Sequence, residues 1–280
     1  MSQNIVINSS HWDASQKKFI YKLRFPQTYS NKQIGLSSVS MYNQFFNVSA
    51  SNGNNTVSIK WVNDITYTYI IADGYYSISE INSYLQNKMI IDKLYMISSD
   101  GVNNVYFVEV IVDSNRYGSQ LNLYTIPTIS QATAKAWTVP ANSSSVWTLS
   151  STVSKTPIIT FNFNFGKLIG FINASYPSVS QTTDYTALSN KTPEISVVNN
   201  IIFRCNLINN LNIEPTDCLS AIPLTGSFGD QMNSSGGWVL YSDIATNTFN
   251  TIELSLSDQN GKSITLIDTE CTIVLSIKSK

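Results

Sequence analysis

The residue types that carry out most acid–base and nucleophilic chemistry are scarce in this chain. Its 280 residues include one histidine, His11, and only 12% of them are charged. Histidines and paired carboxylates perform most proton transfers in enzymes. A Ser-His-Asp triad would have to use His11, and no G-x-S-x-G turn accompanies it. We therefore expect a protein that is not an enzyme, with no catalytic residues and with His11 in a polar N-terminal arm; a hydrolase is the least favoured alternative.

Motifs for cofactors and metals are also incomplete. Glycine-lysine pairs at residues 166–167 and 261–262 look like the end of a phosphate-binding loop, but neither has a glycine five residues before its own glycine. The cysteines form no CxxC pair and no zinc-ligand spacing. We expect no cofactor and no metal site, and we expect free thiols, as in a reducing compartment, at Cys205, Cys218 and Cys271.

The charge balance excludes some partners and permits others. The net charge is −1 and the pI is about 5.8, so there is no broad basic field for specific nucleic-acid binding. A net charge near zero leaves little repulsion against close self-association. No apolar run approaches the roughly 18 residues that a membrane span needs, so we expect no membrane-spanning segment.

Most of the chain has the pattern of β-strands. Apolar and polar residues alternate, or β-branched and aromatic residues follow one another, and every second side chain from Phe19 to Phe25 is apolar. Strands are expected at residues 18–25, 33–42, 56–61, 65–71, 93–97, 104–112, 121–126, 158–165, 194–207, 219–224, 248–256 and 269–277.

One segment, at about residues 77–90, has the pattern of a helix. Ser77 and Glu80 form a capping box, in which each side chain bonds a free backbone N–H of the other residue. The residues on one face are apolar, so we expect a crossover helix that packs on a sheet through Ile78, Ile81, Leu85 and Met89.

The two C-terminal strands are expected to be central or near-central and to pair with N-terminal strands. Their apolar residues recur at every second position and therefore face one core. These residues are Ile252, Leu254 and Leu256, followed by Ile273, Leu275 and Ile277.

Three stretches lack a regular pattern and are expected to be long surface loops. They are residues 128–156, 175–193 and 225–238, and loops of this length are usually functional or flexible. We find no internal repeat and no clear linker. We expect a single all-β domain over residues 1–280, with a second small β-subdomain in the C-terminal half as an open alternative.

Five aromatic residues are candidates for an interface, because aromatic side chains often anchor protein contacts. For Tyr42, Phe45 and Phe46, packing in the core is the favoured alternative. Trp137 and Trp147 stand among small polar residues, where a water-exposed indole is costly, and they are the better candidates for a contact.

Five segments of the chain resemble the minor capsid (penton) proteins of virophages and polinton-like viruses. They lie towards both ends of the chain, and the resemblance is weaker in its middle. The segments are residues 8–10 (NSS), 19–26 (FIYKLRFP), 34–48 (IGLSSVSMYNQFFNV), 71–82 (IADGYYSISEIN) and 249–261 (FNTIELSLSDQNG).

The resemblance implies a single jelly-roll β-sandwich that forms a homopentamer at the five-fold vertices of an icosahedral virion. It implies double-jelly-roll major capsid proteins as neighbours, location in the virion, assembly inside the host cell and, as an open question, a host receptor. The alternative from another class is a receptor- or carbohydrate-binding β-protein, such as a fibre or lectin domain.

Overall fold

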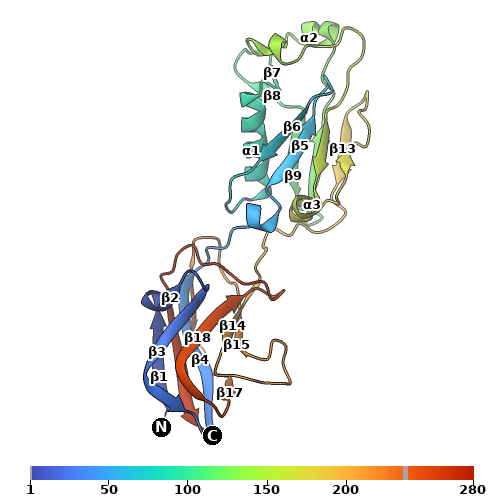
Figure 1. The fold of residues 1–280 in the computed structure, drawn as a ribbon. Coiled ribbons are helices and arrows are strands. Elements are labelled where there is room, and N and C mark those ends of the chain that lie inside the picture. Colours follow the sequence, from blue (N-terminus) through green and yellow to red (C-terminus); the bar gives the residue numbers. More distant parts are fainter. Residues whose placement is uncertain (1, 236–238) are drawn as a thin grey trace. The chain divides into compact units, whose positions relative to one another are not determined.

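The computed structural model describes residues 2–235 and 239–280, and its contacts divide the chain into two compact units. Unit 1 combines the N-terminal part up to Phe45 with Val197–Lys280, and unit 2 is Phe46–Ser196. Each unit has a hydrophobic core of its own. This division differs from the expected single domain over residues 1–280, because the middle of the chain folds around a separate core (Figure 1).

Unit 1 is a sandwich of two antiparallel sheets. One sheet has the order β1-β19-β4-β16, with β17 also on β4, and the other has the order β15-β14-β18-β3-β2. The strands are β1 (Gln3–Asn8), β2 (Trp12–Asp13), β3 (Lys18–Thr28), β4 (Lys32–Tyr42), β14 (Asn200–Cys205), β15 (Cys218–Pro223), β16 (Gln231–Ser235), β17 (Tyr241–Asp243), β18 (Thr248–Ser257) and β19 (Thr272–Ser279).

The strand order of unit 1 is that of a jelly roll. β19 occupies one edge of β4, so β16 and β17 share the other edge and count as one strand. We number the remaining strands 1 to 8 in chain order, leaving out the two-residue β2 and counting β16 and β17 together as strand 6. One sheet then has the order 1-8-3-6 and the other has the order 2-7-4-5. This order confirms the expected jelly roll. Unit 2 is inserted between the third and fourth strands, β4 and β14.

The C-terminal strands pair as the sequence predicts. β18 lies between β14 and β3, and β19 lies between β1 and β4. All six predicted apolar residues of these strands are buried, from Ile252, Leu254 and Leu256 to Ile273, Leu275 and Ile277. The alternation that places them on one face therefore builds the core of the roll.

Unit 2 combines short sheets with helices. Its sheets have the orders β12-β11-β5-β6, β13-β10-β9 and β7-β8. The strands are β5 (Thr56–Lys60), β6 (Thr66–Ile70), β7 (Met96–Ile97), β8 (Asn104–Val105), β9 (Val108–Asp113), β10 (Gly118–Leu123), β11 (Ile158–Phe161), β12 (Ser175–Tyr176) and β13 (Tyr185–Leu188); the helices are α1 (Ile78–Ile91), α2 (Ile129–Ala134) and α3 (Phe163–Ile169).

The helix α1 is the one that the sequence predicts. The Ser77 hydroxyl accepts a hydrogen bond from the Glu80 amide at 3.2 Å, and the Glu80 carboxylate accepts one from the Ser77 amide at 2.7 Å. Its apolar face is buried in the core of unit 2, and it packs beside β9, where the Val110 amide donates to Asn82. The buried face consists of Ile78, Ile81, Leu85 and Met89.

Two further helices were not expected. The predicted strand at residues 158–165 ends at Phe161, because the Asn162 side chain accepts from the Phe165 amide at 2.7 Å and starts α3. Short 3-10 helices occur at Ser9–His11, Ala50–Asn52 and Ser143–Ser145.

The three expected loops contain short elements. Residues 128–156 include α2, residues 175–193 include β12 and β13, and residues 225–238 include β16. Residues 236–238 lie outside the described chain. The N-terminal arm is also more regular than expected, since β1 pairs with β19 along its whole length.

Candidate interaction surfaces

The three aromatic residues at the end of β4 have different environments. Tyr42, the last residue of β4, is 37% exposed. Phe45 is 9% exposed and belongs to the core of unit 1, as the packing alternative predicts. Phe46 is half-buried and is the first residue of unit 2. Of the three, Tyr42 therefore offers the most surface to a partner, and Phe46 keeps part of its own.

The two tryptophans of residues 128–156 pack within unit 2. Trp147 is 3% exposed, its indole N–H donates to the Lys93 carbonyl at 2.7 Å, and its ring meets Trp61 edge-on at 5.5 Å. Trp137 is half-buried, with the Lys135 Nζ 4.3 Å from its ring centre. The chain itself covers Trp147, so this side chain has no surface left for a contact, whereas Trp137 keeps part of its own.

The lone histidine takes part in a local cap. His11 Nδ1 lies 3.0 Å from Asn8 Oδ1 and accepts from the Asn8 amide at 3.3 Å, and its ring lies 5.2 Å from that of Tyr21. Within residues 2–235 and 239–280, no three His, Cys, Asp or Glu side chains come together as ligands for a metal ion. In the same part of the chain, no helix is long and apolar enough to cross a membrane.

The three cysteines are free thiols in the structure. Burial raises the pKa of Cys205 to about 12 and that of Cys271 to about 11. Cys218 is half-buried, and burial raises its pKa as well. Thiolates are the reactive form of cysteine, so these environments keep the thiols protonated and unreactive near neutral pH.

A bulge in β3 carries an exposed aromatic residue, Phe25, although the apolar alternation places it on the same face as the buried Phe19. Lys22 pairs with Thr251 and Gln27 pairs with Phe249, so four residues of β3, 23–26, stand opposite the single Asn250 of β18. The Phe25 side chain is 64% exposed as a result. Pro26 was the signal available in the sequence, because proline inside a strand marks an edge or a bulge.

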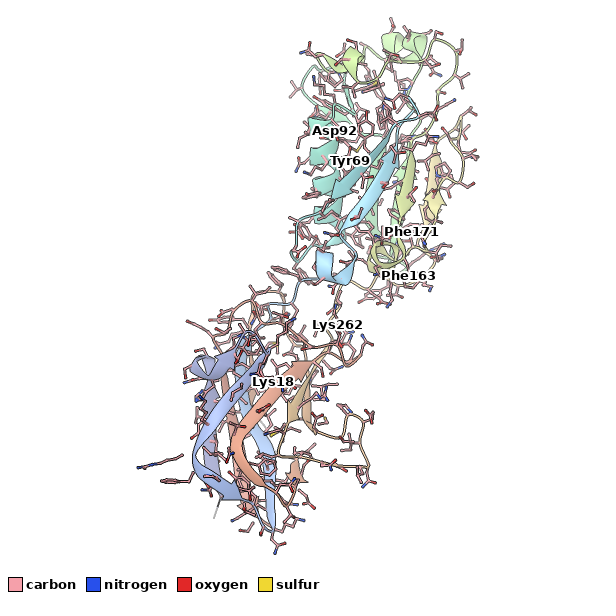
Figure 2. The ribbon with its side chains drawn as sticks, viewed as in Figure 1. Lys18, Tyr69, Asp92, Phe163, Phe171 and Lys262 are labelled. Atoms are coloured by element: carbon pink, nitrogen blue, oxygen red, sulfur yellow. The ribbon has the colours of Figure 1, made fainter. Side chains whose placement is uncertain are left out.

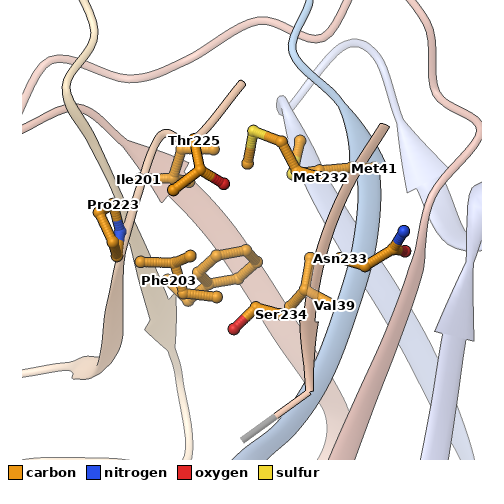
Figure 3. A pocket seen from close by; sticks show the side chains of 10 residues that line it. Val39, Met41, Ile201, Phe203, Pro223, Thr225, Met232, Asn233 and Ser234 are labelled. Carbon is orange, nitrogen blue, oxygen red and sulfur yellow. The ribbon is translucent and has the colours of Figure 1, made fainter. Parts of the chain in front are cut away.

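A narrow apolar cleft opens on the other side of the roll, between the edge strands β15 and β16 (Figure 3). Its volume is about 20 Å³. The residues around it are mostly apolar, and they include Val39, Met41, Ile201, Phe203, Ile222 and Met232.

A larger cavity of about 250 Å³ lies in unit 2, at the end of β5. Lys60, Asp64 and Lys155 line it, together with hydroxyl and aliphatic side chains. Lys60 Nζ lies 2.8 Å from Asp64 Oδ1, and the hydrogen bond and charge of Lys60, with the charge of Lys155, lower the pKa of Asp64. The cavity therefore has two cations for one anion.

A row of hydroxyl groups crosses the sheet face next to this cavity. Thr68, Ser58, Thr160 and Ser175 stand opposite one another on four neighbouring strands. Thr68 and Ser58 are hydrogen-bonded at 3.0 Å, and Thr160 and Ser175 at 2.8 Å. Lys60 lies two residues along β5 on the same face. The hydroxyl groups and Lys60 thus form one polar surface.

Comparisons with known proteins found likenesses in structure alone. No protein-family model matches the chain, and no curated protein matches it. The crystal structure of the selenomethionine-labelled mavirus penton protein is similar over 100% of this chain and 98% of that chain, with 11% identity and a TM-score of 0.44. A chain in the 3.5 Å cryo-EM structure of the Sputnik virophage is similar over 100% of this chain and 98% of that chain, with 14% identity and a TM-score of 0.41. At these scores the likenesses carry no argument, and the jelly roll of unit 1 follows from its strand order.

Proposed function

We propose that this chain is a vertex (penton) protein of an icosahedral virion. Five copies would form a ring at each five-fold vertex and dock on the surrounding double-jelly-roll major capsid proteins. The virion would be assembled inside the host cell. The chain would act by geometry rather than by catalysis.

The observation that carries this proposal is the jelly-roll order of unit 1, taken with the segments that resemble penton proteins. Residues 19–26 lie in β3, residues 34–42 belong to β4, and residues 249–257 belong to β18. Three of the five resembling segments therefore lie mainly on strands that build the roll, whereas residues 71–82 include the start of α1 in unit 2. Jelly rolls occur in viral capsids, lectins and cupins.

The charge of the chain supports self-assembly. The net charge is −1 over 280 residues, so five copies meet little mutual repulsion. The metal-dependent cupin chemistry of other jelly rolls needs clustered histidines and carboxylates, and the described residues form no such cluster.

The test is the symmetry of the purified protein. Light scattering is expected to give a mass of about 156 kDa, five times the chain mass of 31.1 kDa, and electron microscopy is expected to show five-fold rings. Virions made without the gene are expected to have empty vertices. A monomer across the micromolar range, or virions with complete vertices in the absence of the gene, would contradict the proposal.

A second candidate function, binding of an anionic glycan on a host receptor, is favoured by the cavity of unit 2. Its volume of about 250 Å³ is below that of drug-sized pockets, so a single charged sugar is the expected ligand. Lys60 and Lys155 would pair with a carboxylate or sulfate group of that sugar, and the row of hydroxyl groups would bond its ring oxygens.

A screen of neutral, carboxylated and sulfated glycans tests this second candidate. Binding is expected for the anionic glycans and is expected to weaken at least tenfold in Lys60→Gln and Lys155→Gln variants. Lys191→Gln, which removes an exposed lysine elsewhere in unit 2, is the control and should bind like the unchanged protein. Equal binding of neutral and anionic glycans, or none at all, would reject it.

A further inference from the structure

We propose that the Phe25 bulge of one copy inserts into the cleft between β15 and β16 of the next copy, and that this contact closes the ring. The inference rests on the proposed homopentamer and identifies its interface. The bulge comprises residues 23–26, and the occupant of the cleft is a second copy of this chain.

The bulge has the properties of an interface anchor. Phe25 is 64% exposed, and the Arg24 guanidinium lies over its ring at 5.6 Å. Beyond Phe19, the outer edge of β3 pairs with no strand in the part of the chain that the structure describes. Aromatic side chains, phenylalanine included, and arginine are enriched at protein interfaces. An exposed phenylalanine with an adjacent arginine on a strand edge that pairs with no described strand is therefore suited to a contact point.

The cleft is the matching apolar surface. Four of its lining residues, Val39, Met41, Ile201 and Phe203, belong to the roll's core and are at most 4% exposed. Its volume of about 20 Å³ is too small for a benzyl group, so the ring enters only when methionine side chains move aside. Met41 and Met232 line the cleft, and methionine adapts easily because its side chain is long and unbranched.

The bulge and the cleft lie on opposite sides of unit 1. β3 and β2 stand at one side of the sandwich and β15 at the other (Figure 1). The cleft lies between β15 and β16, the edge strands of the two sheets on that other side. A contact between two different surfaces of the same chain is heterologous, and it produces a ring when the rotation between copies closes. The placement therefore favours a cyclic assembly over a two-fold dimer, which would use one surface twice.

Charges beside the two surfaces are complementary. Lys22 and Arg24 are exposed and form no ion pair with any described residue. Asp230 is exposed and directly precedes β16, whose residues border the cleft. Opposite charges at the rim of an interface orient the partners as they meet. The basic bulge is thus suited to the side of the roll that carries Asp230.

A photo-crosslinking residue at position 25 tests the contact in the assembled protein. Irradiation of the pentamer is expected to join position 25 to β15 or β16 of another copy, and mass spectrometry is expected to place the bonds near Pro223 and Met232. The control carries the same residue at position 163. Phe163 is 61% exposed on the first turn of α3 and is labelled in Figure 2. It should give no crosslinks to these strands.

Substitutions at both surfaces provide a second test. Phe25→Glu is expected to shift the pentamer to monomer, whereas the matched Phe163→Glu should leave it intact. Ser234→Trp, which fills the cleft from a half-buried position, should also prevent the ring. Gln231→Trp on the same strand should not, because Gln231 is exposed and is not one of the residues that line the cleft. Circular dichroism and thermal melts verify that each variant is folded.

The outcomes separate this inference from the proposed function. A pentamer that survives Phe25→Glu, or that crosslinks from position 25 to other strands, overturns the contact and leaves the vertex role in place. A wild-type chain that stays monomeric overturns both.

Discussion

Ser77 and Glu80 hold the start of α1 through reciprocal hydrogen bonds. Ser77→Ala removes the acceptor of the Glu80 amide and is expected to lower the free energy of unfolding by about 1 kcal/mol. Ser77→Thr keeps a hydroxyl acceptor and should cost less. Urea titration at pH 7 measures both variants, and equal stability of Ser77→Ala and wild type would show that the cap contributes nothing.

The Glu80 carboxylate adds a pH dependence to the same cap. The Ser77 amide and then the Ser77 hydroxyl donate to it, and these bonds lower its pKa. A lowered pKa means that the stabilisation is complete above the unfolded value of about 4.3 and is lost as the pH falls through the lower folded value. The stability difference between wild type and Glu80→Gln is therefore expected to be larger at pH 7 than at pH 3. An equal difference at both pH values would contradict the assigned role of the carboxylate.

The environments of the cysteines predict an order of labelling. Cys218 is half-buried, whereas Cys205 and Cys271 are buried, with their pKa values raised to about 12 and about 11. Because only the accessible thiolate reacts, iodoacetamide at pH 8 is expected to modify Cys218 first and Cys205 last. Mass spectrometry over time measures this order, and unfolded protein, in which all three should react alike, is the control. Fast native labelling of Cys205 would mean that β14 opens readily.

At the level of elements, β19 is the strand on which the first sheet depends. It pairs with β1 on one side and with β4 on the other, and Ile273, Leu275 and Ile277 fill the core. Deletion of residues 271–280 would leave β1 unpaired and open the core, so we expect insoluble or unfolded protein. Deletion of residues 279–280 removes the strand end, the Lys280–Asp243 ion pair and the hydrogen bonds of this end to Lys32 and Asn31, all of them peripheral to the core, and should leave a folded chain. A soluble, pentameric form of the longer truncation would disprove the central position of β19.

For the whole molecule, the two cores predict that the roll folds without unit 2. Every buried member of the roll's core comes from the two parts of unit 1. Replacement of residues 46–196 by a short Gly-Ser linker is therefore expected to give a chain that melts cooperatively. If the Phe25 contact closes the ring, this shortened chain should also form pentamers. Excision of residues 32–205, which removes β4 and β14, is the negative control and should not fold. Calorimetry and light scattering measure the two properties.

Features that depend on near neighbours in the chain were determined by the sequence itself. The cap at Ser77, the apolar face of α1 and the alternation in β18 and β19 follow from hydrogen bonds and side-chain directions within a few residues. The scarcity of histidine and of charged residues likewise favours a role in surface contacts over a role in catalysis. These local rules predicted a β-rich chain with one well-placed helix.

Tertiary structure decided the features that depend on distant partners. The alternation puts Phe25 on the same face as the buried Phe19, but four residues of β3 stand opposite one of β18, and Phe25 is 64% exposed. Trp147 looked like an exposed anchor, but Lys93 and Trp61, distant in the chain, bury it. The insertion of residues 46–196 between β4 and β14 has no local signal, because strand order results from which apolar faces pack together across the whole chain.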